Sequence, residues 1–195
     1  MAFQRHALPL ALLTTVLASS AILAQRPPDP ATLIAAQRQG MASLAYMDGV
    51  WRGPATVMSP TGETMKITQT ERIGPFLDGS LKVIEGRGYR ADGTPGFNAF
   101  GIISYNPADK SYTMRSYAQG YHGDFALTPT ADGYTWEVPA GPGATIRYTA
   151  VVKDGKWREV GDRIAGGGPP VRIFEMNLVR VGDSDWPVAG TIKPQ

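Results

Sequence analysis

The chain has 195 residues, a formal net charge of +2, no cysteine and two histidines. A charge this close to neutral, with no run of lysine and arginine, argues against binding of nucleic acid through its phosphates. The absence of cysteine excludes disulfides and zinc sites with thiolate ligands, and two histidines are too few for a zinc site built on imidazoles. No Asp-rich loop of the EF-hand type occurs, so we expect no metal and no other cofactor.

Residues 1–24 are typical of a secretory signal peptide. Arg5 supplies a positive start, Leu8–Leu17 forms a short apolar core, and small residues offer a cleavage site after Ala21 or Ala24. The apolar core is too short to cross a membrane, and no later run approaches ~18 apolar residues. We therefore expect export to the periplasm of a Gram-negative bacterium, or secretion, with no transmembrane segment in the mature protein. A retained N-terminal anchor helix is the alternative.

Residues 25–47 predict a linker followed by one helix. Two prolines at positions 27 and 28 favour an extended spacer, and Asp29 followed by Pro30 is a typical helix start. The predicted helix spans Ala31–Met47, and Gly40 weakens it by ~1 kcal/mol relative to alanine. This helix could cap one end of the domain that follows it. A frayed leader is the alternative.

Residues 48–182 predict a single all-β domain, followed by a C-terminal tail at 183–195. Turn sequences with an Asp-Gly pair recur between runs rich in β-branched and aromatic residues. Most connections have hairpin length, which favours an antiparallel up-and-down meander. Closing about ten such strands into a barrel removes two exposed edges, whereas a two-sheet sandwich is the alternative. The predicted strands span 49–58, 64–73, 79–89, 97–105, 111–118, 121–127, 133–138, 144–152, 156–164 and 171–181.

The alternation of side chains along a strand assigns the residues that face the interior. Trp51 shares its face with glycine, alanine and valine, which indicates that it packs at the floor of the barrel. In the strand 64–73, the even positions from 66 to 72 are all polar or charged and clearly face solvent. Gln69 and Glu71 therefore face the interior or its mouth.

Two further strands predict a polar interior. Glu85, Arg87 and Tyr89 share one face of their strand, and Glu159 shares a face with Trp157 in another strand. Burial of an unpaired carboxylate is costly, so these groups must pair, meet water or contact a polar ligand. Interior ion pairs without any ligand are the alternative.

Two Arg-x-Tyr sequences and one histidine carry further chemistry. Arg87 with Tyr89, and Arg115 with Tyr117, each place a guanidinium and a phenol on one face, a combination that can clamp a carboxylate. His122 is the sole histidine after the predicted signal peptide, and histidine is the side chain that titrates nearest neutral pH. It is a candidate general acid or base with its neighbour Asp124, and a histidine at the surface is the alternative.

Asp48-Gly49-Val50-Trp51-Arg52-Gly53 resembles the start of calycin-type barrels, which include lipocalins and fatty-acid-binding proteins. Together with Gly101–Asn106, Tyr112 and Phe174–Arg180, it makes residues 40–181 most similar to the bacterial DUF1579 family, whose function is unknown. The resemblance implies a closed barrel around an interior site, without a particular activity. The related nitrobindin barrels hold haem through a histidine near the C-terminus, and the C-terminal half here has none, so haem is not expected.

These observations favour an exported barrel that binds a small, mostly apolar ligand with a polar head group. The partner is then a small hydrophobic or amphipathic molecule. One alternative is an enzyme, an isomerase, lyase or hydrolase acting in the same interior, with His122, Glu71 or Glu159 as general acid or base. Another is a structural or partner-binding envelope protein. The candidate ligand-binding residues are Gln69, Glu71, Glu85, Arg87, Tyr89, Arg115 and Tyr117.

Overall fold

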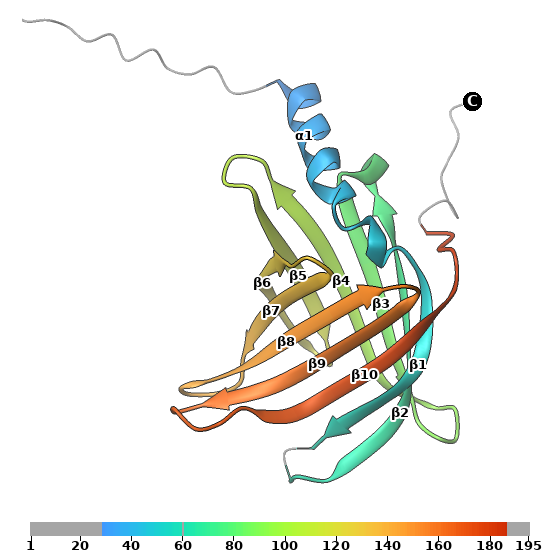
Figure 1. Ribbon diagram of the computed structural model, residues 1–195, viewed down its shortest axis with the longest axis vertical. Coiled ribbons are helices and arrows are strands. Elements are labelled where there is room, and N and C mark those ends of the chain that lie inside the picture. The colour runs from blue at the N-terminus through green and yellow to red at the C-terminus, as the bar shows by residue number, and fades with distance from the viewer. Residues whose placement is uncertain (1–28, 60, 187–195) are drawn as a thin grey trace, which may run out of the picture.

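A closed antiparallel barrel of ten strands forms the body of the protein (Figure 1). The computed structural model describes residues 29–59 and 61–186, so the predicted signal peptide lies outside the described residues. Each strand pairs with the next one along the chain, and the first strand pairs with the last. This is the up-and-down barrel that the spacing of the turns predicts.

The strands agree with the predicted segments, with differences of a few residues at their ends. β2 continues beyond residue 73 because Pro75 and Phe76 still pair with the start of β3. The strands are β1 (Gly49–Met58), β2 (Thr64–Phe76), β3 (Leu81–Tyr89), β4 (Pro95–Asn106), β5 (Ser111–Ala118), β6 (Tyr121–Pro129), β7 (Gly133–Pro139), β8 (Ala144–Lys153), β9 (Lys156–Ala165) and β10 (Val171–Gly182). A short 3-10 turn, η2 (Leu77–Gly79), connects β2 to β3.

One α-helix, α1 (Pro30–Ala42), precedes the barrel. Its first turn is capped as the sequence predicts, because the Asp29 side chain accepts a hydrogen bond from the backbone N–H of Thr32 at 3.1 Å. The helix ends earlier than predicted: the N–H of Ser43 returns to the carbonyl of Gly40, and the chain continues through a 3-10 turn, η1 (Ala45–Met47). Within the part of the chain that the structure describes, no helix is long and apolar enough to cross a membrane.

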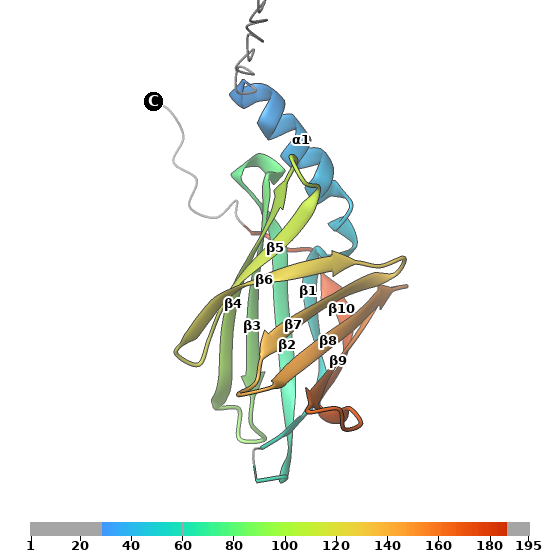
Figure 2. The same cartoon turned by 90° about the vertical axis from the view of Figure 1, so that its left-hand side faces the viewer.

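The end of α1 and the turn η1 close one end of the barrel, here called the helix end (Figures 1 and 2). The Tyr112 hydroxyl, from β5, donates to the Gly40 carbonyl at 2.8 Å and lies 2.8 Å from the Ser43 hydroxyl. Tyr46 donates to the Gly133 carbonyl at the start of β7 at 2.8 Å. Three apolar residues of this segment are buried and continue the core of the barrel: Met41, Leu44 and Met47.

Trp51 packs beneath this cover. Its side chain is 1% exposed, its indole N–H donates to the carbonyl of Met47 at 2.9 Å, and its ring meets Trp157 edge-to-face at 5.6 Å. The hydrogen bond satisfies the only polar atom of a large apolar side chain, so the full area of the indole contributes to stability. Trp51 is therefore part of the core, as its small neighbours indicate.

Gly40 gives a direct test of how α1 sits on the barrel. In an exposed helix, Gly→Ala stabilises by ~1 kcal/mol. At Gly40, however, a Cβ atom would lie 2.3 Å from the Tyr105 ring. We expect Gly40→Ala to lower the free energy of unfolding by roughly 1–3 kcal/mol, the usual cost of overpacking, in urea unfolding followed by circular dichroism. Gln39→Ala, at an exposed neighbour, is the control and should stay within ~0.5 kcal/mol of the parent; a gain of stability in Gly40→Ala would contradict this packing.

Candidate functional site

Two carboxyl side chains face the interior of the barrel, Glu71 from β2 and Glu159 from β9. Residues that oppose each other in an antiparallel ladder point to the same face. Glu71 opposes the buried Trp51, and Glu159 opposes the buried Ala150. The two residues are only 8% and 6% exposed. The two-residue period therefore assigns both acids correctly to the inside.

Neutral donors hold both carboxyl groups. Gln69 donates its amide to Glu71 at 2.7 Å. The Tyr134 hydroxyl and the Trp136 indole donate to the two oxygens of Glu159 at 2.7 Å and 3.1 Å. Within residues 29–59 and 61–186, neither acid forms a salt bridge, and no group of three potential ligand side chains is arranged to hold a metal ion.

Burial dominates the protonation of this pair. It raises the pKa of Glu71 to about 8, against the hydrogen bond from Gln69, and the neighbouring Glu159 adds to the rise. Burial also raises the pKa of Glu159, although its hydrogen bonds from Tyr134 and Trp136 favour the ionised form. The pKa of Tyr134 lies well above its usual value, first through burial and then through the charge of Glu159. At neutral pH, Glu71 is therefore a protonated acid in a buried environment.

Two buried polar atoms beside these acids have no hydrogen-bond partner in the described structure: Oε1 of Gln69 and Nε1 of Trp157. Gln69 is 2% exposed, and its amide nitrogen already donates to Glu71. The Trp157 indole lies near enough to Glu159 to favour ionisation of that carboxyl, yet outside hydrogen-bond geometry. A buried polar atom without a partner costs ~1–3 kcal/mol, so each such atom calls for a water or a ligand group.

Two glycines of the barrel wall make room for inward-facing side chains. Gly86 of β3 opposes Glu71, and a Cβ there would lie 2.8 Å from the nearer carboxyl oxygen. Gly161 of β9 lies between two aromatic rings, since a Cβ there would lie 2.8 Å from Tyr148 and 3.1 Å from Phe174. Glycine is thus required at both places because a carboxyl group or an aromatic ring approaches the backbone closely.

A row of aromatic rings continues from the acids toward the end opposite α1, here called the far end. Phe125 lies 5.8 Å from Trp136, which stacks on Tyr148 at 4.5 Å with an interplanar angle of 16°. Tyr148 in turn meets Phe174 edge-to-face at 6.1 Å. We call Phe125, Trp136, Tyr148 and Phe174 the aromatic row. All four are partly exposed although they face inward, so solvent reaches this part of the interior.

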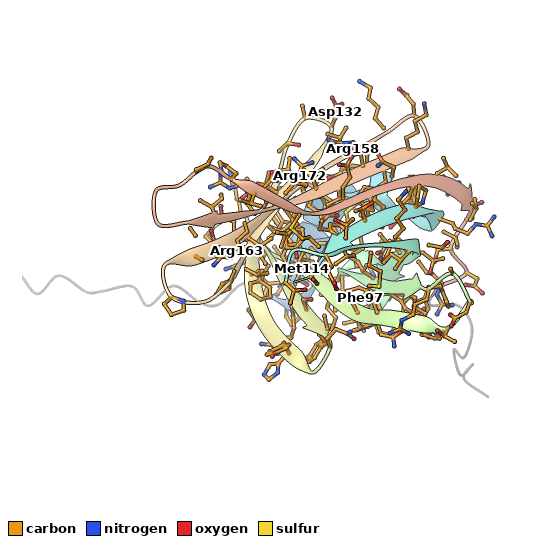
Figure 3. All side chains as sticks on the ribbon, turned by 90° about the horizontal axis from the view of Figure 1, so that it is seen from below. Phe97, Met114, Asp132, Arg158, Arg163 and Arg172 are labelled. Atoms are coloured by element: carbon orange, nitrogen blue, oxygen red, sulfur yellow. The ribbon has the colours of Figure 1, made fainter. Side chains whose placement is uncertain are left out.

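Two further inward-facing side chains are exposed at the far end, Met65 and Arg163, of which Arg163 is labelled in Figure 3. Met65 opposes the inward-facing Val57 and is 45% exposed. Arg163 opposes Ile146 on the same face as Glu159 and is exposed. The sheet is also incomplete toward this end. β6 and β7 pair over only three residues, from Leu127 to Pro129, and these lie on the side of the helix end. Phe125, two residues beyond that short ladder, lies 5.8 Å from Trp136, which forms the last pair of the ladder with Leu127.

The prediction that Glu85, Arg87 and Tyr89 face the interior is wrong. Gly86 and Gly88 oppose the inward Glu71 and Gln69, so the odd positions of β3 lie on the outer wall. Glu85 pairs there with Arg72 at 2.8 Å and with Arg87 at 2.6 Å. Although partial burial alone would raise it, the pKa of Glu85 is lowered by these two arginines.

The apolar residues of β3 misled the assignment of its faces. Val83 is 5% exposed although it lies on the outer wall, opposite Gly74 and Ile102. The segment that follows β10 covers this surface, because the Trp186 carbonyl lies over Gly74 and the Trp186 ring meets Phe100 edge-to-face at 5.8 Å. An apolar face on β3 therefore marks contact with the C-terminal segment.

Arg115 and Tyr117 also lie on the outer wall. The buried Met114 faces inward, so the odd positions of β5 face outward. Both nitrogens of the Arg115 guanidinium that face Asp124 donate to its carboxylate, at 2.6 Å and 2.5 Å. That carboxylate already occupies the guanidinium fork that a ligand carboxylate would need. Neither Arg-x-Tyr sequence forms an interior clamp.

His122 is exposed on the outer wall and stacks on Tyr117 at 6.0 Å. It lines an open groove of about 540 Å3 over β3, β4 and the β5–β6 turn, together with Glu85, Arg87 and Tyr117. A smaller groove of about 330 Å3 over β1 to β3 includes Arg87 and Tyr89. The wall of the barrel separates His122 from Glu71 and Glu159, so the three candidate acid–base residues do not share one site.

Sequence reasoning missed several residues of the interior. Tyr134 and Trp136 bind Glu159, yet their strand is too short for its period to stand out. Lys82 is buried at the helix end, where it forms an ion pair with Asp48. Lys82 was missed because the two faces of β3 were assigned the wrong way round. The same error concealed that Gly86 and Gly88 face inward.

A crystal structure shares this fold. Rv2717c from M. tuberculosis matches with a TM-score of 0.56 at 13% sequence identity, over 73% of this chain and 97% of that one. At this identity the similarity concerns the fold alone. No known family profile and no curated protein matches the chain. A ten-strand β-barrel is therefore the class that the fold defines, and the resemblance to the DUF1579 family stays a prediction.

The raised pKa of Glu71 predicts how stability depends on pH. Between pH 4.5, the usual pKa of the side chain, and about 8, the folded protein holds a proton that the unfolded chain has released. The free energy of unfolding should then fall as pH rises, by up to ~1.4 kcal/mol per pH unit for this group. We expect the Tm to fall from pH 5 to pH 8 in the parent and to fall less in Glu71→Gln. Glu137→Gln, at an exposed carboxylate of the outer wall that pairs with Arg147, is the control; equal slopes in the parent and Glu71→Gln would contradict the assignment.

Proposed function

We propose that this protein is an exported barrel that binds a small, mostly apolar molecule with a polar head group inside the barrel. The head group would sit at Gln69, Glu71, Glu159 and Trp157, and the apolar part would run along the aromatic row. Known small-molecule sites have this composition, with mostly apolar walls and a few placed polar groups.

The unpaired buried atoms carry this proposal. Oε1 of Gln69 and Nε1 of Trp157 offer one acceptor and one donor beside two carboxyl groups. A barrel that served only as a scaffold would be more stable with apolar residues at these positions, because unpaired polar groups in an apolar surrounding cost free energy. A ligand or water with both donor and acceptor capacity removes that cost.

The aromatic row supports the proposal that part of the ligand is apolar. Its four rings contact one another and face inward while remaining partly exposed. Phe, Tyr and Trp gain most from covering large apolar areas, so an apolar molecule that displaces water from these rings is stabilised. The exposed Met65 supports a route of entry at the far end.

An enzymatic use of the same interior is the second candidate. Its specific support is Glu71, whose pKa of about 8 after burial lies near neutral pH, as suits a general acid or base. The geometry favours Glu71 and Glu159 over His122 for that role, because the two acids share the interior. Conversion of a bound molecule, followed by mass spectrometry, would distinguish an enzyme from a binding protein.

Two neighbouring positions test the route of entry. Met65→Trp enlarges an inward-facing, exposed side chain at the far end, whereas Lys66→Trp adds the same ring to the outer wall. We expect the neutral fluorescent probe N-phenyl-1-naphthylamine to bind the parent and Lys66→Trp alike. Met65→Trp should weaken its binding about tenfold or more, because the added ring blocks the mouth. Equal binding by both variants would contradict entry at the far end, and no binding by any of the three would contradict the proposed function.

A further inference from the structure

The polar interior has an unbalanced set of hydrogen-bonding groups. Glu71 and Glu159 supply four oxygens, and Oε1 of Gln69 is a further acceptor without a donor. The donors that reach the acids are a side-chain amide, a phenol and an indole, all neutral. In the described part of the chain, no arginine or lysine forms a salt bridge with either acid. Among the described residues, the two acids thus lack a cationic side chain as partner.

The inward-facing basic residues are engaged elsewhere or lie far from the acids. Lys82 is paired with Asp48 at the helix end. Arg163 lies four residues beyond Glu159 on the same strand face, roughly 13 Å away at the rise of a β-strand. Glu85, which also influences Glu71, lies on the outer wall with two arginine partners. Around the acids themselves, the ionisable neighbours are Tyr134, Tyr148 and each other.

Aromatic rings surround the same two acids. Trp157 meets Trp51 edge-to-face at 5.6 Å and Tyr134 at 6.3 Å. Trp136, which donates to Glu159, is also the second ring of the aromatic row. The faces of such rings attract cations, most strongly where water is excluded. Carboxyl groups, a free amide oxygen and aromatic faces together complement an ammonium group.

We propose that the head group recognised by this interior is a protonated amine, carried by a small apolar molecule. This inference rests on the proposed function and specifies its ligand class. The ammonium would donate to Oε1 of Gln69 and to the carboxylate of Glu71. Because an ammonium accepts no hydrogen bond, the Trp157 indole would donate to a water or to Glu159, which it already approaches. The apolar part would follow the aromatic row toward the far end.

Proton linkage makes this ligand class measurable. Because burial holds the pKa of Glu71 near 8, an ammonium that binds below this pH must displace the proton of Glu71. Affinity for an amine should therefore rise about tenfold per pH unit from pH 6 and level off near pH 8. A neutral alcohol displaces no proton, and its affinity should not change. A carboxylate would bind less tightly as pH rises, since the interior becomes more negative.

The experiment compares three ligands with one apolar chain: octylamine, octanol and octanoate. Each competes with the neutral probe N-phenyl-1-naphthylamine on the full purified protein at pH 6, 7 and 8. We expect octylamine to gain about tenfold in affinity between pH 6 and 7 and to bind most tightly of the three at pH 8.

Variants assign the effect to Glu71. Glu71→Gln keeps the shape and one acceptor oxygen, so we expect it to fold, to bind octanol within about twofold of the parent, and to lose at least about tenfold in octylamine affinity at pH 8. Its octylamine affinity should no longer depend on pH between 6 and 8. Glu137→Gln, at an exposed carboxylate of the outer wall that pairs with Arg147, is the matched control and should behave as the parent. If Glu71→Gln does not fold, Glu159→Gln removes a charge that helps to raise the pKa of Glu71, so the rise of octylamine affinity should move to lower pH.

The outcomes separate the two proposals. Binding of octanol or octanoate that equals or exceeds that of octylamine at pH 8, or an octylamine affinity that does not vary with pH, overturns the amine inference and leaves the binding function intact. Probe binding by none of the proteins overturns the binding function itself. A rise with pH that persists in Glu71→Gln overturns the assignment to this carboxyl.

Discussion

The closure of the sheet between β1 and β10 is the constraint on which the other properties depend. Closure gives the barrel an inside, and the ladder register then decides which side chains enter it. Glu71 lies opposite the inward-facing Trp51, and Glu159 lies opposite the inward-facing Ala150. Both acids therefore face the interior and become buried. Without the closed wall, the same carboxyl groups would be solvated, and their pKa values would not be raised.

The polar interior has a cost that the rest of the barrel must offset. The cover formed by α1 and η1 adds Met41, Leu44 and Met47 to the core, and the two tryptophans Trp51 and Trp157 fill the space beneath it. These contacts exclude water from the acids at the helix end, while the far end keeps inward-facing side chains exposed. One end of the barrel therefore supplies stability, and the other supplies access.

The architecture was predictable because it follows from local signals. Hairpin-length turns and alternating strands specify an antiparallel meander, and the polar even positions of β2 place Gln69 and Glu71 inside. The face of β3 was not predictable, because Trp186, distant in sequence, covers its outer side and makes Val83 buried. The partners of Glu159 were hidden for a similar reason: they arise from register between β7 and β9, strands that do not neighbour each other.

This correction changes the chemistry of the site. With Arg87 and Arg115 inside, the barrel would present guanidinium groups with tyrosines and favour a carboxylate ligand. Both arginines instead bind carboxylates of the outer wall, Glu85 and Asp124, and the inside retains acids held by neutral donors. The charge expected of the proposed ligand is thereby changed from negative to positive. Since the acids have no salt-bridge partner in the described chain, a cationic head group would complete the interaction that the fold leaves open, and an anionic one would add to its repulsion.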